Sequence, residues 1–317
     1  SADFSWVDNA SASAWEVEYG ISGFALSSGT QVNATVTNSS LTGLMANTSY
    51  DVYVRADCGP SNQSSWSGPV TFRTLPQGPQ GFSCTTGSPG VFFSEEFDNN
   101  SAGWTGDIGT SNGEWSIPNS SASANTGAAS AHSGSNYMKF EASNTSTSTV
   151  GNAVSPAIDL TTAAGGVELS FWMHAYGADM GTLNVGVANS PLGPFTNEFT
   201  WIGELQDSAN QDWVNVGVDL SAYIGQTIYI NLAQIDSIGG TLGDMSIDLF
   251  EVSTCVPCAS PTSLNATNVS ANLADLSWTE NGGSTVWDIE YGVSGFGLGN
   301  GTTVTGVSSN PYTLSGL

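Results

Sequence analysis

Apolar and polar residues alternate along most of the chain, in short runs separated by clusters of Gly, Ser and Asn. Residues 15–19 read Trp-Glu-Val-Glu-Tyr and residues 50–56 read Tyr-Asp-Val-Tyr-Val-Arg-Ala, each with a period of two. Side chains two positions apart share one face of a strand, so this period indicates half-buried β-strands. No amphipathic run of useful helical length interrupts them. The pattern therefore predicts an all-β protein built from short antiparallel strands.

The start of the chain returns near its end. Residues 2–24 and 274–296 align without a gap, and 12 of the 23 positions are identical. The recurring aromatic pairs are Trp6 and Trp278, Trp15 and Trp287, and Tyr19 and Tyr291. Self-similarity at a fixed spacing marks a repeat array, and a spacing of 272 residues means that whole domains recur.

This repeat leads to an expectation about the two ends. Gly43-Leu44 matches Gly316-Leu317, so the repeated unit extends past both ends of the sequence. We expect the chain to be cut from a continuous repeating polymer, in which the unit begun at residue 256 is completed by the counterpart of residues 45–75. The rival account is strand exchange between separate short chains.

The chain is acidic because it has almost no cations. Only 10% of its residues are charged, three of them basic, and the net charge is −25. Binding to nucleic acid requires clustered Lys and Arg, so the composition excludes that partner and disfavours anionic membrane surfaces. Its 10 Trp, 13 Phe and 9 Tyr provide a core, which argues against disorder. No apolar stretch reaches the ~18 residues of a membrane span, so no membrane insertion is expected.

Both ends of the chain, residues 1–75 and 256–317, resemble fibronectin type III domains. Thr48 and Tyr50 stand where that family opens its sixth strand, with the Tyr hydroxyl holding the preceding corner, and Trp6 stands at its core tryptophan. The resemblance implies two incomplete sandwiches. The first lacks its first strand, and the second lacks everything after its fifth.

The middle of the chain, residues 84–255, resembles a MAM domain, the jelly-roll sandwich of adhesive ectodomains, and residues 76–83 form a linker before it. That family opens with Cys, Phe-Glu and Gly-Trp and closes with Ile-Asp and a final Cys. The matching residues are Cys84, Glu95-Glu96-Phe97, Gly103-Trp104, Ile247-Asp248 and Cys255. The resemblance implies a disulfide between Cys84 and Cys255, and hence an oxidising compartment.

The other two cysteines lie in the fibronectin-like segments. Cys58 ends a fibronectin-like sixth strand, and Cys258 begins a first strand. We expect them to pair with counterparts across a repeat boundary and not with each other in this chain. Free buried thiols are the alternative.

No catalytic constellation can be assembled from the sequence. The only histidines, His132 and His174, stand in unlike contexts, so a Ser-His-Asp site cannot be proposed. The HExxH motif and a phosphate-binding loop do not occur. Glu95 and Glu96 are strand neighbours that face opposite ways, which is unsuited to a glycosidase pair. We expect a protein without enzymatic activity.

Three carboxylates form a candidate calcium site. Glu96 and Asp98 are two residues apart, so on a strand both point to one face, and Asp248 lies on the last strand. Jelly-roll modules commonly close a calcium site between their first and last strands, and calcium takes about 6–8 oxygen ligands. We expect a structural calcium ion here. The alternative is a solvated acidic strand face.

Two features suggest glycans. Ser208 and Ser237 each follow Asp and precede an aliphatic residue, which resembles the O-glycosylation signal of Bacteroidota. Trp201 and Trp213 are candidates for exposed aromatic residues that contact glycans, with core packing as the alternative.

Alternating fibronectin-like and MAM-like units in an acidic, Cys-poor chain resemble the giant surface adhesins of Bacteroidota-type bacteria, including gliding-motility adhesins. The resemblance implies a non-catalytic segment of a secreted, cell-surface adhesin or fibre. Its partners would be neighbouring repeats and glycans or cell-surface proteins. The alternatives are a carbohydrate-binding or accessory region of a large secreted hydrolase, and a stalk without a ligand.

Overall fold

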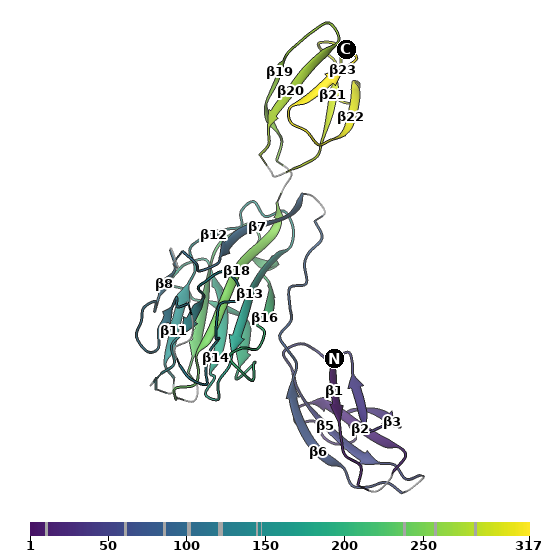
Figure 1. The fold of residues 1–317 in the computed structure, drawn as a ribbon, viewed down its shortest axis with the longest axis vertical. Helices are drawn as coiled ribbons and strands as arrows, with labels where there is room; N and C mark the ends of the chain where they lie inside the picture. Colours follow the sequence, from purple (N-terminus) through teal and green to yellow (C-terminus); the bar gives the residue numbers. More distant parts are fainter. Residues whose placement is uncertain are drawn as a thin grey trace.

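The structure is a computed structural model, and it describes residues 1–9, 12–59, 62–84, 87–99, 103–119, 123–143, 145–146, 148–236, 239–256, 259–281 and 284–317. Throughout these ranges the regular structure is β-strand, apart from one 3-10 turn, η1 (Ser221–Tyr223). The predicted all-β fold is confirmed. The strands form three units along the chain, and the largest lies between the other two (Figure 1).

The N-terminal unit, residues 1–75, contains two antiparallel sheets. Its strands are β1 (Ala2–Ser5), β2 (Trp15–Ile21), β3 (Thr30–Ala34), β4 (Asn38–Leu41), β5 (Ser49–Ala56) and β6 (Ser67–Arg73). One sheet pairs β1 with β4, and the other has the order β3-β2-β5-β6. Val17, Leu41 and Val52 are its buried centre, since alternate residues of these strands face the space between the sheets. Met45 N donates a 3.0 Å hydrogen bond to the Tyr50 hydroxyl in the corner before β5.

The central unit, residues 84–256, is a sandwich of two six-stranded sheets. Its first strands are β7 (Ser88–Glu95), β8 (Thr105–Gly106), β9 (Trp115–Ser116), β10 (Met138–Phe140), β11 (Val150–Val154) and β12 (Ile158–Asp159). The later ones are β13 (Val167–Ala175), β14 (Thr182–Ala188), β15 (Thr196–Ile202), β16 (Val214–Asp219), β17 (Thr227–Ile235) and β18 (Met245–Val256). One sheet, called here the front sheet, has the order β16-β13-β18-β10-β9, and β7 also pairs with β18. The back sheet has the order β15-β14-β17-β11-β8, and β12 also pairs with β17.

The core of the central unit fills the space between these two sheets. From the front sheet, Phe171 and Met173 of β13 point into it, and both are fully buried. From the back sheet, Leu183 of β14 and Ile230 of β17 meet them. Burying side chains of this size stabilises a fold by about 1.5–3 kcal/mol each. The residues between them on β13 must then face outward, since successive strand residues point to opposite faces.

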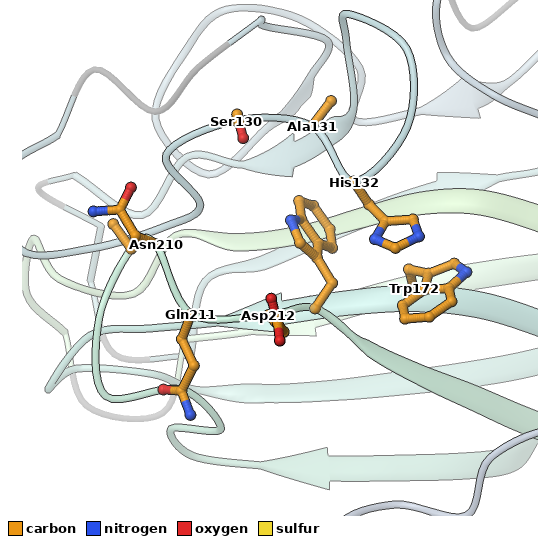
Figure 2. Close-up of a pocket in the computed structure, with 9 residues that line it drawn as sticks. Ser130, Ala131, His132, Trp172, Asn210, Gln211 and Asp212 are labelled. Atoms are coloured by element: carbon orange, nitrogen blue, oxygen red, sulfur yellow. The ribbon is translucent and has the colours of Figure 1, made fainter.

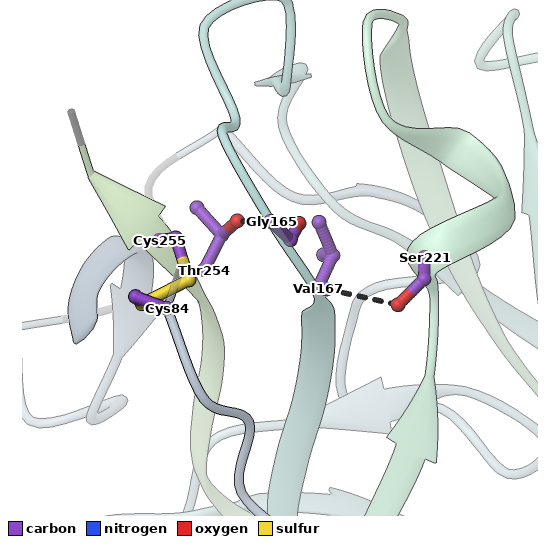
Figure 3. The surroundings of a disulfide bond; sticks show 6 residues. All are labelled: Cys84, Gly165, Val167, Ser221, Thr254 and Cys255. Carbon is purple, nitrogen blue, oxygen red and sulfur yellow. Dashed lines mark hydrogen bonds between the residues drawn. A yellow bond between two sulfur atoms is a disulfide. The ribbon is translucent and has the colours of Figure 1, made fainter. Parts of the chain in front are cut away.

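A disulfide joins Cys84 to Cys255, near the end of β18, with 5.5 Å between the two Cα atoms (Figure 3). A glycine is required beside it, because a Cβ on Gly165 would lie 2.6 Å from the Cys255 sulfur. Cys58 is a free, exposed thiol. Cys258 lies outside the described residues, so the expected pairing of Cys58 and Cys258 across repeats stays a prediction.

The C-terminal unit, residues 259–317, repeats part of the N-terminal unit. Its strands are β19 (Thr262–Thr267), β20 (Leu273–Thr279), β21 (Trp287–Tyr291), β22 (Thr302–Val307) and β23 (Tyr312–Ser315). They form one sheet of order β19-β20-β23 and a second that pairs β21 with β22. The indoles of Trp278 and Trp287 meet edge to face at 5.2 Å, as those of Trp6 and Trp15 do at 5.9 Å. The sequence repeat is therefore also a repeat of packing.

The linker between the first two units lies along the front sheet. Gly217 N in β16 donates a 2.8 Å hydrogen bond to the Gln77 carbonyl. The carboxylate of Glu168 in β13 accepts hydrogen bonds from Gln80 N and Gly81 N, at 2.6 and 3.1 Å. These contacts attach the linker to the sandwich at several points, so it is not a free spacer.

Candidate functional site

A groove of about 530 Å³ lies on the outer face of the front sheet, between two loops (Figure 2). Its lining residues are Ser130, Ala131, His132, Trp172, Ala209, Asn210, Gln211, Asp212 and Trp213. Small-molecule sites commonly have volumes of roughly 300–1,000 Å³ and combine aromatic walls with a few polar groups. The groove therefore has the size and the lining of a ligand site.

The strand pairing of the front sheet places three of the aromatic side chains. Trp172 and His174 occupy outward positions of β13, between the core residues of that strand. Trp172 pairs with Asn215 of β16, so Trp213, just before β16, comes opposite His174. The rings of His174 and Trp213 are 5.5 Å apart. Alternation on one strand and register with the next thus bring these rings to one place.

The aromatic rings of the groove hold one another in position. His132 stacks on Trp172 with 3.8 Å between ring centres and 15° between planes. Trp213 meets His132 and Tyr137 edge to face, at 6.3 and 5.5 Å. The Trp213 indole is half-buried and has neighbours on several sides, so it is a preorganised surface and not a mobile side chain.

Two aspartates fix the loop that carries His132. Asp248 Oδ2 accepts hydrogen bonds from His132 N and Ser133 N, at 2.8 and 3.0 Å. Asp98 Oδ1 accepts them from Ser135 N and Asn136 N, at 2.7 and 2.9 Å. These last two bonds lower the pKa of Asp98, because they favour its charged form. Burial raises the pKa of Asp248, and its amide hydrogen bonds oppose that effect.

A glycine lets this loop approach Asp98. Gly134 has a φ of +62°, and a Cβ there would lie 2.0 Å from Asp98 Oδ2. A side chain at residue 134 would therefore be strained in its backbone and would collide with the carboxylate. The close approach of loop and carboxylate depends on this position being glycine.

The loop that forms the other wall, residues 203–213, is held in place by the buried side chain of Gln206. Gln206 is 1% exposed, and its Oε1 accepts a 2.7 Å hydrogen bond from Ala175 N at the end of β13. Its Nε2 donates to the carbonyls of Met173 and Asp212, at 3.3 and 3.2 Å. Farther along, Gln211 Oε1 accepts a 2.6 Å hydrogen bond from Asp207 N. Both walls of the groove are therefore tied to the front sheet.

His174 lies beneath the groove and is fully buried. Burial lowers its pKa to about 4, and the nearby backbone groups of Ser208 and Gln211 oppose this shift only in part. The imidazole is therefore neutral at neutral pH. It serves as a packing surface for Trp213 and not as a source of positive charge.

The comparison with protein families decides the identity of the central unit. The model of the MAM domain, described as meprin/A5/mu, matches residues 96–259, which is more than half of the chain. The chain belongs to the MAM family. No curated protein matches it in sequence. No helix in the described ranges is long and apolar enough to cross a bilayer.

Solved structures similar to the chain include two cleaved adhesin domains of Lys-gingipain from Porphyromonas gingivalis. The first is 20% identical over 52% of this chain and 98% of that one, with a TM-score of 0.38. The second is 16% identical over 51% and 98%, with a TM-score of 0.36. The CBM22-1 xylan-binding domain of Xyn10C from Paenibacillus barcinonensis is 13% identical over 56% and 100%, with a TM-score of 0.31.

The two tryptophans proposed as glycan contacts have different environments in the MAM domain. Trp213 lines the groove. Trp201, on β15, is 2% exposed and lies under Arg73 of the N-terminal unit, so its indole is not open to a glycan. Ser208 is exposed in the loop that forms one wall of the groove. Ser237 lies outside the described residues.

The expected calcium ligands are not gathered around one point. β7 ends at Glu95, and Phe97 has a φ of +59° with its ring fully buried, so the strand alternation assumed for Glu96 and Asp98 stops between them. Glu96 is exposed, whereas Asp98 and Asp248 accept amide hydrogen bonds. In the part of the chain that the structure describes, no group of three or more His, Cys, Asp or Glu could hold a metal ion.

Sequence reasoning missed most of the groove. From the sequence, Trp172 and Asn210 are not singled out, and His132 and His174 are weighed only as members of a catalytic site. One signal was available: Trp172 and His174 alternate with core residues, so they had to face outward together. The loop residues gave no comparable signal, because their neighbours come from distant parts of the chain.

Proposed function

We propose that this chain is a non-catalytic segment of an extracellular adhesin or fibre and that its MAM domain binds glycans in the groove. The observation that carries the proposal is the fixed aromatic surface of Trp213 and of the stacked Trp172 and His132, bordered by amide, hydroxyl and carboxylate groups. The gliding-adhesin relationship and the fibronectin-like character of the outer units belong to the same proposal.

The chemistry of the groove suits a sugar. The C–H face of a pyranose ring packs on the electron-rich face of an indole, and Trp213 offers a half-exposed indole held in place. The hydroxyls of the sugar need donors and acceptors close to that face. The side chains of Asn210, Gln211 and Ser130 provide both kinds.

The same groove does not suit hydrolysis of the glycan. Glycosidases use two carboxyl groups that flank the scissile bond. Among the described residues that line the groove, Asp212 is the only carboxylate, and His174 beneath the groove is buried and neutral. Binding without turnover therefore fits the side chains that are present. It also fits a secreted segment whose disulfide belongs to an oxidising compartment.

A glycan array followed by calorimetry tests the proposal. The full chain is screened first, and Trp213→Ala is then compared with the native chain. We expect the variant to bind its glycan at least about tenfold more weakly, since a central aromatic contact carries much of the binding energy at such sites. Trp66→Ala is the matched control, because Trp66 is a half-buried tryptophan of the N-terminal unit, stacked under Arg55. Equal affinity of the native chain and Trp213→Ala, or release of shortened sugar, would refute the proposal.

A further inference from the structure

We infer that the groove selects uncharged glycans and rejects glycans that carry carboxylate or sulfate groups. The inference rests on the proposed function and narrows its ligand class. It follows from where the three basic side chains of the chain are placed and from the charges that face the groove.

Two of the three cations belong to the N-terminal unit and are engaged there or at its border. Arg55 forms an ion pair with Glu16, with 2.5 Å between nitrogen and oxygen, and its guanidinium lies 4.5 Å from the Trp66 ring centre. Arg73 lies 4.3 Å from the centre of the Trp201 ring on β15, a strand of the back sheet. The groove is on the front sheet, so neither guanidinium lines it.

The third cation is buried within the MAM domain. Lys139 on β10 is 4% exposed and is bonded to Glu141 at 2.7 Å and to Asp244 at 3.3 Å. Its ammonium group already has two carboxylates as partners. It is not available to an anionic ligand outside the sheet, and it is not among the residues that line the groove.

The charges near the groove are negative. Asp212 is exposed on its wall, Asp207 is exposed in the same loop, and Asp248 lies behind the backbone of His132. The described residues that line the groove include no Lys or Arg, and the ring of His132 is stacked on Trp172. An acidic sugar would thus meet like charges without a Lys or Arg partner, and the net charge of −25 adds repulsion at longer range.

The polar groups that remain match hydroxyls. The exposed carboxylate of Asp212 only accepts hydrogen bonds, so it needs donors such as sugar O–H groups. Gln211 has its Oε1 occupied by Asp207 N, which leaves its NH₂ group as a donor to sugar oxygens. The side chains of Asn210 and Ser130 can both donate and accept hydrogen bonds. A chain of neutral hydroxyl-bearing rings satisfies this set, whereas a carboxylate or sulfate opposite Asp212 does not.

The test compares ligands that differ only in charge. Hexagalacturonate and its fully methyl-esterified form have the same backbone, and a panel of neutral and sulfated oligosaccharides extends the comparison on an array. Binding to the full chain is measured by calorimetry at low and high salt. We expect neutral members to bind, Trp213→Ala to weaken that binding at least about tenfold, and charged members to bind the native chain at least about tenfold more weakly than neutral ones at low salt. Asp212→Asn should reduce the difference in affinity between neutral and charged glycans, because it removes the negative charge of the carboxylate and keeps the shape of the side chain.

The possible outcomes separate the inference from the proposed function. If acidic glycans bind as tightly as neutral ones, and Trp213→Ala weakens both, the inference is overturned and the glycan site stands. If no glycan of either class binds, the proposed function fails and the inference fails with it. If acidic glycans bind the native chain but not His132→Ala, the inference is also overturned. The imidazole of His132 would then be the cation that pairs with them.

Discussion

The guanidinium of Arg73 lies 4.3 Å from the centre of the Trp201 ring and joins the N-terminal unit to the MAM domain. Its Nη1 donates a 2.8 Å hydrogen bond to the Ile202 carbonyl, and its Nη2 donates a 2.6 Å bond to Asn47 Oδ1. Asn47 Nδ2 in turn donates to the Thr200 carbonyl at 2.8 Å. Burial lowers the pKa of Arg73, but an arginine remains charged in proteins. One cation therefore makes a stacking contact and bridges two units.

The first prediction concerns this contact. Arg73→Ala should leave both units folded but let them move relative to each other, because it removes the stacking and two hydrogen bonds. Cation–π contacts contribute about 0.5–2 kcal/mol and hydrogen bonds to charged groups about 1.5–3 kcal/mol. Small-angle scattering should show a broader distribution of interatomic distances. The matched control is Arg55→Ala, whose guanidinium stacks on Trp66 within one unit. A scattering curve of Arg73→Ala that is identical to the native one would contradict the prediction.

The second prediction concerns the disulfide. It closes a loop with a sequence separation of 171 residues, and in the chain-entropy model a loop this long stabilises the fold by roughly 5 kcal/mol. Cys255→Ser should therefore lower the denaturant midpoint of the MAM domain strongly. Cys58→Ser serves as the control, because Cys58 is an exposed free thiol. Equal midpoints for the native chain and Cys255→Ser would show that the bond contributes nothing.

The third prediction concerns acid pH. His174 has a pKa of about 4 in the folded protein and an ordinary value of about 6.5 when unfolded. Between these values the unfolded chain binds the extra proton, so stability is present above about pH 6.5 and is lost as pH falls toward 4. The loss should reach about 3 kcal/mol at most. Carboxylates titrate in the same range, so the measurement is the difference between the native chain and His174→Gln. Parallel stability curves over this range would exclude the effect.

Structural calcium near Asp98 and Asp248 stays a prediction. Both carboxylates face the loop of residues 132–136, and their oxygens keep lone pairs beyond the amide hydrogen bonds. An ion that binds only the folded form raises the melting temperature by mass action. We expect excess chelator to lower the melting temperature of the native chain, and we expect no further drop in Asp98→Asn. If the native chain has the same melting temperature with calcium and with chelator, the prediction of a structural calcium ion is wrong.

The fifth prediction concerns the repeat. In the N-terminal unit β2 has β3 on one side and β5 on the other, and Trp15 is 7% exposed. Among the described residues of the C-terminal unit, β21 pairs with β22 alone, and Trp287, the equivalent residue, is half-exposed. A copy of residues 45–75 fused after Leu317 continues the repeat in register and should supply the counterparts of β5 and β6.

Fluorescence and thermal melting measure the outcome of this fusion. The emission of the C-terminal tryptophans should move to shorter wavelength as the added strands cover them, and the melting temperature of that unit should rise, since an open sheet edge gains a partner. A fusion of the same residues in scrambled order is the control. If both fusions behave alike, the repeat in sequence does not extend to completion of the sheet.

The sequence alone determined the class of fold and indicated the order of the repeated and central segments along the chain. The period of two in residues 15–19 and 50–56 is a local property, and any chain that buries one face of such runs forms strands. The motif residues that resemble a MAM domain, from Cys84 to Cys255, also needed no coordinates. The same holds for the scarcity of Lys and Arg, on which the expectation of no nucleic-acid partner rests.

Only the tertiary structure decided which residues meet. Trp201 and Trp213 are both tryptophans near strand ends, yet one lies beneath Arg73 and the other lines a groove, because their neighbours come from residues more than a hundred and about eighty positions away. The positive φ of Phe97 ended an alternation that the sequence suggested for Glu96 and Asp98. Local patterns set the direction of a side chain along its strand, whereas the pairing of distant loops sets its surroundings, and that pairing depends on the packing of the whole sandwich.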